Sequence, residues 1–185
     1  MTVPRHHPNM LSQLRDFARG QSGVAAVEFA GVVPFMLLLY LGGVELGTGV
    51  AINRKVAVTT RAVADLATRY TTIKNAEMAG ILGSAGALIA PYDPSKLAVT
   101  VSEITVDAKG NASVAWSDTQ GGSARGAGSP MTLPATLQTP GASYILGEVQ
   151  YDYKPAIGYV LTGAVPLSNH IFMSPRESAA ITRAP

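Results

Sequence analysis

The sequence reads VAAVEFAGVVPFMLLLYLGGV from Val24 to Val44. Residues 29–44 within it carry no charge, and the carboxylates Glu28 and Glu45 bracket them. At about 1.5 Å per residue, a helix over 24–44 extends roughly 31 Å, which matches a hydrocarbon core of about 30 Å. Apolar side chains surround this helix at 35–40 and leave no polar face. The stretch therefore predicts a membrane-spanning helix over residues 24–44.

The composition of the whole chain agrees with a membrane anchor. Hydrophobic residues make up 47% of the 185 residues and charged residues only 14%, against roughly 25% charged in a typical soluble domain. These values exclude a disordered, highly charged protein. The chain has no cysteine, which excludes a disulfide framework and a thiolate metal site. A net charge of +2 is too small to indicate a nucleic-acid surface.

A basic segment with Arg5, Arg15 and Arg19 precedes the span. Such a segment also suits an ordinary secretory signal, although the apolar stretch exceeds the usual length of about 7–15 residues for the core of such a signal. The small residues that end at Ala51 offer only a weak cleavage site. Basic residues flank the span on both sides, so charge counting does not set its orientation.

Glu28 lies near the start of the predicted span, where an unpaired carboxylate costs about 2.5–3.5 kcal/mol. One interpretation is that its side chain reaches the headgroups, or that the membrane helix begins at Phe29. Another interpretation supplies a cation, because cleavage after Gly23 would create an α-amino group at Val24, one helical turn away. The α-amino group of a neighbouring subunit could pair with the Glu28 carboxylate equally well. In a low dielectric, such a pair is strongly favoured over two separate buried ions.

The residues around Glu28 carry a resemblance to a known family. The string GVAAVEF at 23–29 looks like a prepilin-type processing site, and residues 19–47 resemble the N-terminal signature of TadE-like pseudopilins of tight-adherence (Tad, or Flp) pili. The pattern is a basic leader, a glycine, an A-V-E-F core, a proline, a leucine-rich run and a second glutamate before glycine. These places are occupied by Arg19, Gly23, residues 26–29, Pro34, residues 36–39, Glu45 and Gly47.

The resemblance implies roles for these residues. A prepilin peptidase would cut after Gly23, which makes residues 1–23 a cytoplasmic basic leader and Val24 the mature N-terminus. Glu28 would promote processing or fix the register between subunits. The other signature positions are Phe29, Pro34 and Glu45. The segment Met173-Ser174-Pro175-Arg176 resembles a short Pro-Arg tail common in these proteins.

The resemblance also implies a place and partners. The protein would be a minor pseudopilin needed for pilus assembly and surface adhesion. It would be a single-pass protein of the inner membrane, with a cytoplasmic N-terminus and a periplasmic C-terminal domain, and its incorporation into the extracellular pilus is left open. Its partners would be the prepilin peptidase, other pseudopilins and the major Flp pilin.

Pro34 and Glu45 carry further expectations. Proline lacks an N–H, so Pro34 would kink or locally open the helix. Glu45 follows Glu28 by roughly 25 Å along a helix, which places it near the outer headgroups. We expect a solvated carboxylate there.

Beyond the span, the patterns predict an α+β fold: the long N-terminal transmembrane helix, a small helical segment and an antiparallel sheet. A helical stalk covers 45–92, with a second helix over 76–90 that Pro91 ends. A periplasmic domain covers 93–185, with a flexible loop at about 120–142 that is rich in Gly, Ser, Thr and Pro.

Alternating apolar residues place strands in the distal domain at 97–106, 112–116 and 144–153, with short edge strands at 170–173 and 179–182. A change of phase near Glu103 indicates a β-bulge, and Gly110 indicates a turn. Val149, Tyr151 and Tyr153 share one face, where we expect a small core.

The motifs do not indicate catalysis. Acidic residues are dispersed without the spacing of a calcium loop, and His170 has no second histidine at ligand spacing. Ser117 and Asp118 lack the context of a nucleophile elbow. We therefore predict a protein that is not an enzyme and has no cofactor, metal, nucleic-acid partner or small-molecule substrate.

Two alternatives to the minor pseudopilin stay open. One is an uncleaved single-pass periplasmic scaffold or binding module. The other is a secreted enzyme or carbohydrate-binding domain with an ordinary signal peptide. A mature start at Val24, an intact Met1 and a start after Ala51 distinguish the three hypotheses.

Overall fold

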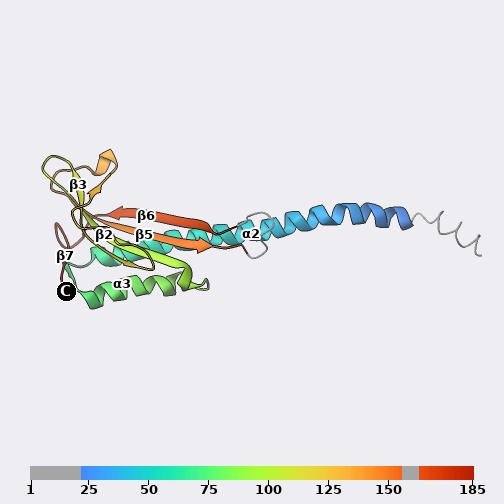
Figure 1. The fold of residues 1–185 in the computed structure, drawn as a ribbon, viewed down its shortest axis with the longest axis horizontal. Helices are drawn as coiled ribbons and strands as arrows, with labels where there is room; N and C mark the ends of the chain where they lie inside the picture. The colour runs from blue at the N-terminus through green and yellow to red at the C-terminus, as the bar shows by residue number, and fades with distance from the viewer. Residues whose placement is uncertain (1–21, 156–162) are drawn as a thin grey trace, which may run out of the picture. The chain divides into compact units, whose positions relative to one another are not determined.

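The computed structural model describes residues 22–155 and 163–185. The chain divides into two units, Met1–Glu45 and Leu46–Pro185. The first contains the start of helix α2, and the second contains the rest of this helix and a folded domain (Figure 1). The fold is α+β, as the sequence predicts: a long apolar N-terminal helix, a short helix and an antiparallel sheet.

Helix α2 (Ser22–Thr68) has 47 residues and includes Pro34. It is rich in Ala, Leu and Val, which form helices readily or pack well in apolar surroundings. The helix continues through Pro34 and beyond Glu45, which confirms that the helical pattern extends past the apolar stretch.

A short connection with strand β1 (Thr72–Ile73) leads to helix α3 (Asn75–Leu88). The Glu77 carboxylate accepts a hydrogen bond of 2.7 Å from the Lys74 backbone N–H, so it satisfies one of the orphan donors at the start of α3. The helix ends before Pro91, close to the predicted bounds of 76–90.

The main sheet has five strands in the order β4-β3-β2-β5-β6, and every neighbouring pair is antiparallel. A second, two-stranded sheet pairs β1 with β7 in parallel. The bounds are β2 Leu97–Val106, β3 Ala112–Gln120, β4 Pro130–Met131, β5 Ser143–Tyr153, β6 Val165–Met173 and β7 Thr182–Arg183, with 3-10 turns at η1 Pro94–Lys96 and η2 Ala135–Leu137. Gly110, with φ +86°, lies in the predicted turn between β2 and β3.

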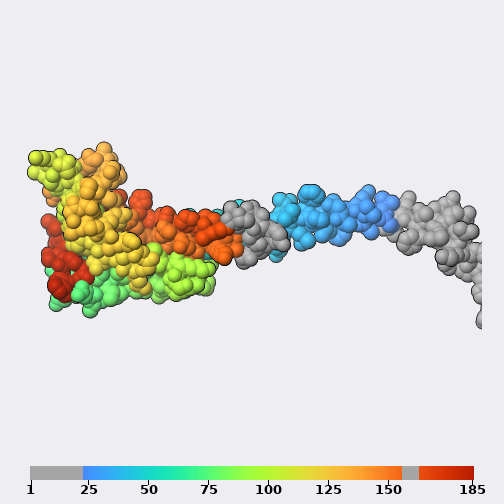
Figure 2. Space-filling view, in the orientation of Figure 1, coloured from blue at the N-terminus to red at the C-terminus, as the bar shows by residue number. Residues whose placement is uncertain are grey.

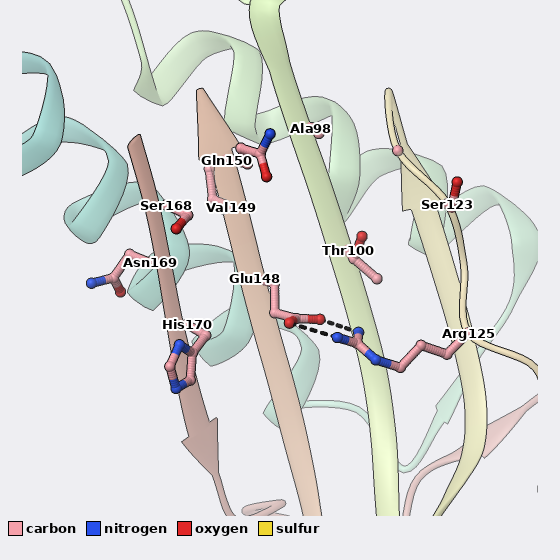
Figure 3. A pocket seen from close by; sticks show the side chains of 11 residues that line it. Ala98, Thr100, Ser123, Arg125, Glu148, Val149, Gln150, Ser168, Asn169 and His170 are labelled. Carbon is pink, nitrogen blue, oxygen red and sulfur yellow. Dashed lines mark hydrogen bonds and ion pairs between the residues drawn. The ribbon is translucent and has the colours of Figure 1, made fainter. Parts of the chain in front are cut away.

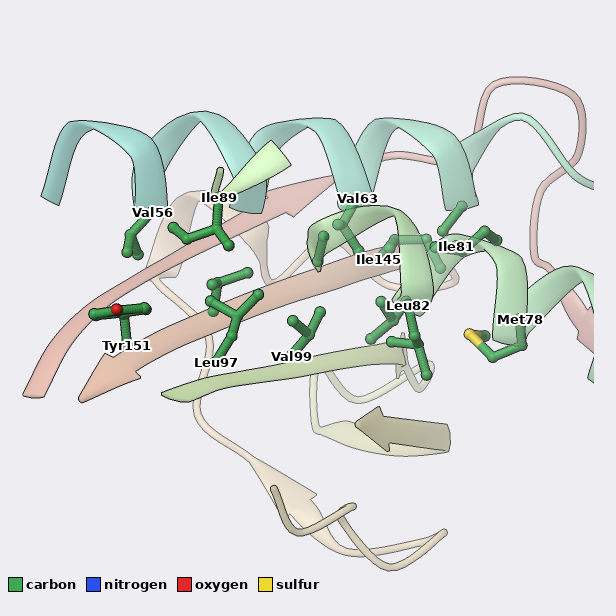
Figure 4. Packing of buried hydrophobic residues seen from close by; sticks show 14 of the residues in the cluster. Val56, Val63, Met78, Ile81, Leu82, Ile89, Leu97, Val99, Ile145 and Tyr151 are labelled. Carbon is green, nitrogen blue, oxygen red and sulfur yellow. The ribbon is translucent and has the colours of Figure 1, made fainter. Parts of the chain in front are cut away.

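The main core lies between one face of the sheet and the helices of the second unit (Figure 4). We call this face of the sheet the inner face. Strands β2 and β5 contribute alternate residues such as Val99 and Ile145, while α2 and α3 contribute Val56, Val63 and Ile81. Tyr151 and Tyr153 are buried in the same core with Val149, as their shared face predicts.

Gly147 brings β5 and α2 into close contact. A Cβ atom at this position would lie 2.8 Å from the Ala64 Cβ and 3.3 Å from the Thr60 carbonyl oxygen. Real Cβ atoms essentially never approach that closely, so the absence of a side chain allows this helix–sheet distance.

A second core lies at one end of the opposite, outer face. It consists of Ile104, Val106, Val114, Leu133, Tyr144 and Leu146. Leu133 comes from the stretch 120–142 that we expected to be a loop, and this stretch also contains β4 and η2. The buried Leu133 therefore anchors part of that segment to the sheet.

The register explains the change of phase near Glu103. Strand β2 pairs with β5 without interruption, whereas its pairing with β3 shifts between Glu103 and Ile104. Glu103 faces Trp116 and Ile104 faces Val114, so Ala115 is the extra residue of a bulge in β3. The predicted bulge is confirmed, but it lies in β3. The apolar side chains of β2 change from one face of the sheet to the other because the second core covers the outer face at that end of the strand.

We predict that Gly147→Ala destabilises the folded domain by about 1–3 kcal/mol, because the added methyl group overpacks the contact with Ala64. The measurement is the urea unfolding midpoint of the detergent-solubilised chain, followed by near-ultraviolet circular dichroism. Gly126→Ala is the matched control, since its added Cβ meets no atom within 4 Å. Equal midpoints for the two variants would contradict this account of the packing.

Candidate functional site

The first unit presents an apolar helix surface. Large hydrophobic side chains are exposed on all sides of it, with Leu39 78% and Val27 74% exposed (shown in blue in Figure 2). Helix α2 is long and apolar enough to cross a membrane, and its most apolar stretch has no buried residue. Exposure of this much apolar surface to water is unfavourable, so lipid or other apolar helices are its suitable surroundings.

The residues of the predicted processing site lie in the first turns of α2. A Cβ at Gly23 would meet no atom within 4 Å, and Val24 is 61% exposed. Glu28 is exposed and follows Val24 by one helical turn. The geometry thus places the Val24 backbone nitrogen and the Glu28 side chain in neighbouring turns.

The other signature residues have different surroundings. Phe29 is 69% exposed, and Pro34 lies inside the helix. Glu45 is only 7% exposed, so it is not the solvated carboxylate that its distance from Glu28 led us to expect.

The C-terminal tail, residues 174–185, is bound to the end of α2. The Arg176 backbone N–H donates to the Thr68 carbonyl oxygen at 2.9 Å, and the Arg176 guanidinium pairs with Asp65. Asp65 also accepts from Arg69 at 2.6 Å. The hydrogen bond from Arg69, supported by the charge of Arg176, lowers the pKa of the Asp65 carboxyl against a smaller effect of desolvation.

The same tail contacts the sheet through Ile181, which is buried. Its backbone N–H donates to the Glu103 carboxylate at 2.7 Å, and its carbonyl accepts from the Trp116 indole at 2.8 Å. Glu103 also accepts from the Ser143 hydroxyl at 2.6 Å. Buried carboxylates require such donors, so Glu103 positions the tail. Its only signal in the sequence is a lone charge within an apolar strand.

Arg183 completes the attachment of the tail. Its guanidinium binds the Asp118 carboxylate at 2.8 and 3.1 Å and the Asn75 side-chain oxygen at 2.7 Å. The hydrogen bonds that Arg183 donates to Asp118 raise the pKa of Arg183. These contacts join the start of α3, strand β3 and the tail.

The structure separates the residues that a catalytic triad would need. Ser117 accepts a hydrogen bond from the Arg125 backbone N–H at 3.1 Å, whereas Asp118 is bound by Arg183. His170 lies on β6, with β2 and β5 between it and β3. Among residues 22–155 and 163–185, no group of three His, Asp or Glu side chains is arranged to hold a metal ion.

Residues 23–65 match the model of the TadE-like protein family, so the chain contains a TadE-like domain there. The matched segment begins at Gly23 and includes Glu28, Pro34 and Glu45. Neither the curated proteins nor the solved structures include a match to this chain.

Asp65 is the last residue of the matched segment, and its lowered pKa predicts a pH dependence. The stabilisation is complete above the ordinary carboxyl pKa of about 3.9 and is lost as the pH falls through the lower pKa of the folded state. We expect Asp65→Asn to lower the thermal unfolding midpoint at pH 6 and to flatten its decrease between about pH 4 and pH 2. Glu177→Gln, which removes an exposed carboxylate from the C-terminal tail, is the control and should keep the original profile. A profile for Asp65→Asn that is parallel to that of the unaltered chain would contradict the role of this carboxylate.

Proposed function

We propose that this protein is a minor pseudopilin of the tight-adherence pilus, a non-enzymatic subunit needed for pilus assembly and surface adhesion. Residues 24–44 would anchor it in the inner membrane, with a cytoplasmic leader and a periplasmic domain. The observation that carries the proposal is the exposed apolar start of helix α2, which carries Glu28 one turn beyond Val24 and lies in the TadE-like domain that begins at Gly23. The partners would be the prepilin peptidase, other pseudopilins and the major Flp pilin.

The exposed helix surface supports an assembly mechanism without chemistry at an active site. Apolar side chains that face lipid can face the similar side chains of neighbouring subunits instead. Because the two surroundings are nearly equally apolar, packing and polar contacts decide whether the helices associate. A polar group on the helix therefore has a large influence on which arrangement forms.

Glu28 is the polar group near the proposed cut. Side chains on a helix lean toward its N-terminus, so the Glu28 carboxylate points toward the turn that contains Val24. Cleavage after Gly23 would place a positive amine in that turn. The resulting amine–carboxylate pair, within one chain or between two, would remove the cost of an isolated charge and fix the axial position of the subunit.

Pro34 adds local freedom to the same helix. Because proline has no N–H, the carbonyl of Ala30 lacks its usual helical donor. This permits the helix to bend or open near its middle as it passes from lipid into a bundle. Helix α2 continues through Pro34, so the helix accommodates the proline in this structure.

Maturation of the native chain tests the proposal directly. We expect N-terminal sequencing of the protein from bacterial membranes to begin at Val24, and Gly23→Leu to retain the full leader. Gly20→Leu is the matched control, since it changes a glycine of the leader outside the proposed cut. An intact Met1 in the unaltered protein would favour the uncleaved scaffold, and a start after Ala51 would favour an ordinary signal peptide; either result overturns the proposal.

Assembly tests the role of Glu28. We expect Glu28→Gln to reduce recovery of the chain with the pilus subunits after cross-linking in membranes by about tenfold, corresponding to about 1.4 kcal/mol. Glu177→Gln is the control, since it removes the same charge in the exposed tail. Recovery of Glu28→Gln equal to that of the control would show that this carboxylate does not determine assembly.

A further inference from the structure

The polar part of the outer sheet face is hollowed into a groove (Figure 3). Its volume is about 440 Å³, and its lining includes Thr100, Arg125, Glu148, Gln150, Ser168 and His170. We call this hollow the outer groove. Its floor comes from β2, β5 and β6, whose facing residues Thr100, Glu148 and His170 stand in one row across the sheet.

A defined loop forms one wall of the outer groove. Gly121 has φ +75°, and a Cβ there would lie 2.5 Å from the Leu97 carbonyl oxygen, so only glycine fits this turn. Farther along, the Arg125 backbone N–H donates to Ser117, which bonds Ser102 at 2.8 Å. The backbone of the loop is therefore attached to the sheet at the point from which the Arg125 side chain extends.

The charges that line the outer groove neutralise each other. The Arg125 side chain crosses β2 and makes two hydrogen bonds to the Glu148 carboxylate on β5, one of them 2.7 Å long (Figure 3). This pairing raises the pKa of Arg125, and the formal charges of the two side chains cancel. A ligand with a strong charge of either sign would have to compete with this pair.

Internal hydrogen bonds leave acceptor oxygens available on the floor. Thr119 donates its single hydroxyl proton to the Val99 carbonyl, so the hydroxyl of Thr100 must donate to Thr119. The Thr100 oxygen then retains acceptor capacity. Gln150 directs its amide nitrogen toward Asp152 at 3.1 Å, which leaves its amide oxygen as an acceptor. A matching ligand has to supply several hydrogen-bond donors.

An apolar hollow of about 460 Å³ adjoins the outer groove and shares Glu148 and His170 with it. Leu133, Pro134 and Phe172 contribute to its lining, and the ring of Phe172 lies edge-to-face with that of His170, 6.1 Å between centroids. The surface thus changes from neutral hydrogen-bonding groups to apolar groups over a short distance. A pyranose ring has the same combination, with hydroxyl groups around its rim and C–H groups on its faces.

We propose that the outer groove binds a neutral saccharide chain. Its hydroxyls would donate to Thr100, Glu148 and Gln150, while a ring face would cover the apolar hollow beside His170. The pairing of Arg125 with Glu148 would exclude strongly charged sugars and keep the wall of the groove in place. This inference rests on residues of the second unit alone and does not depend on cleavage after Gly23.

The test uses the full chain in a zwitterionic detergent without sugar groups and three neutral probes: chitotetraose, cellotetraose and maltotetraose. Saturation-transfer NMR and a titration up to about 10 mM detect weak binding, which is expected for an open groove. We expect at least one probe to bind, and Gln150→Ala/Ser168→Ala to weaken its affinity at least about tenfold. The matched control is Gln120→Ala/Ser174→Ala, which changes exposed residues outside the groove.

The outcomes are distinct from those of the maturation experiment. Binding that the groove variant loses and the control variant retains would support the proposal, whatever the mature N-terminus. Failure of all three probes to bind would overturn it, as would equal affinity of the two variants. Preferential binding of a neutral polar peptide, such as Ser-Gln-Asn-Ser, in place of the saccharides would assign the groove to a protein partner and would also overturn it.

Discussion

Helix α2 of the second unit is held against the sheet where Ala64 meets strand β5, and Gly147 makes the contact possible. The main core continues along the same helix face through Val56, Val63 and Ala67, which are fully buried. Other faces of this helix segment are exposed, for example at Val58 and Arg61. One continuous helix therefore has an apolar surface on all sides in the first unit and a single buried face in the second.

The two units are therefore stabilised in different ways. The second unit has its own core, formed by one sheet face and two helices, and its tail is held by hydrogen bonds and ion pairs. The apolar segment of the first unit has no comparable core, and its energy depends on the surroundings that it meets. The first unit therefore depends on the apolar groups around it, and the second unit depends on its internal packing.

Local patterns predict much of this architecture. Uninterrupted apolar residues identify the start of α2, and alternation identifies β2, β3 and β5 within a few residues. Alternation reports which side of a strand is buried but not what buries it, so the second core around Leu133 is not foreseen. One partner of Glu103, Ile181, lies 78 residues away, and Arg125 meets Glu148 across 23 residues. Such pairings depend on the tertiary arrangement of segments that are distant in sequence. A local hydrophobic pattern does not encode this arrangement.

Strand β7 pairs with β1, and Ile181 reaches the carboxylate in the middle of β2. Protein synthesis proceeds from the N-terminus, so these last contacts become available only when residues 181–184 have left the ribosome. The sheet and helices can approach one another earlier, and the contacts of residues 181–184 then complete the packing. A bulky label attached at residues 181–184 would interfere with these contacts, whereas a label in an exposed turn would leave them intact.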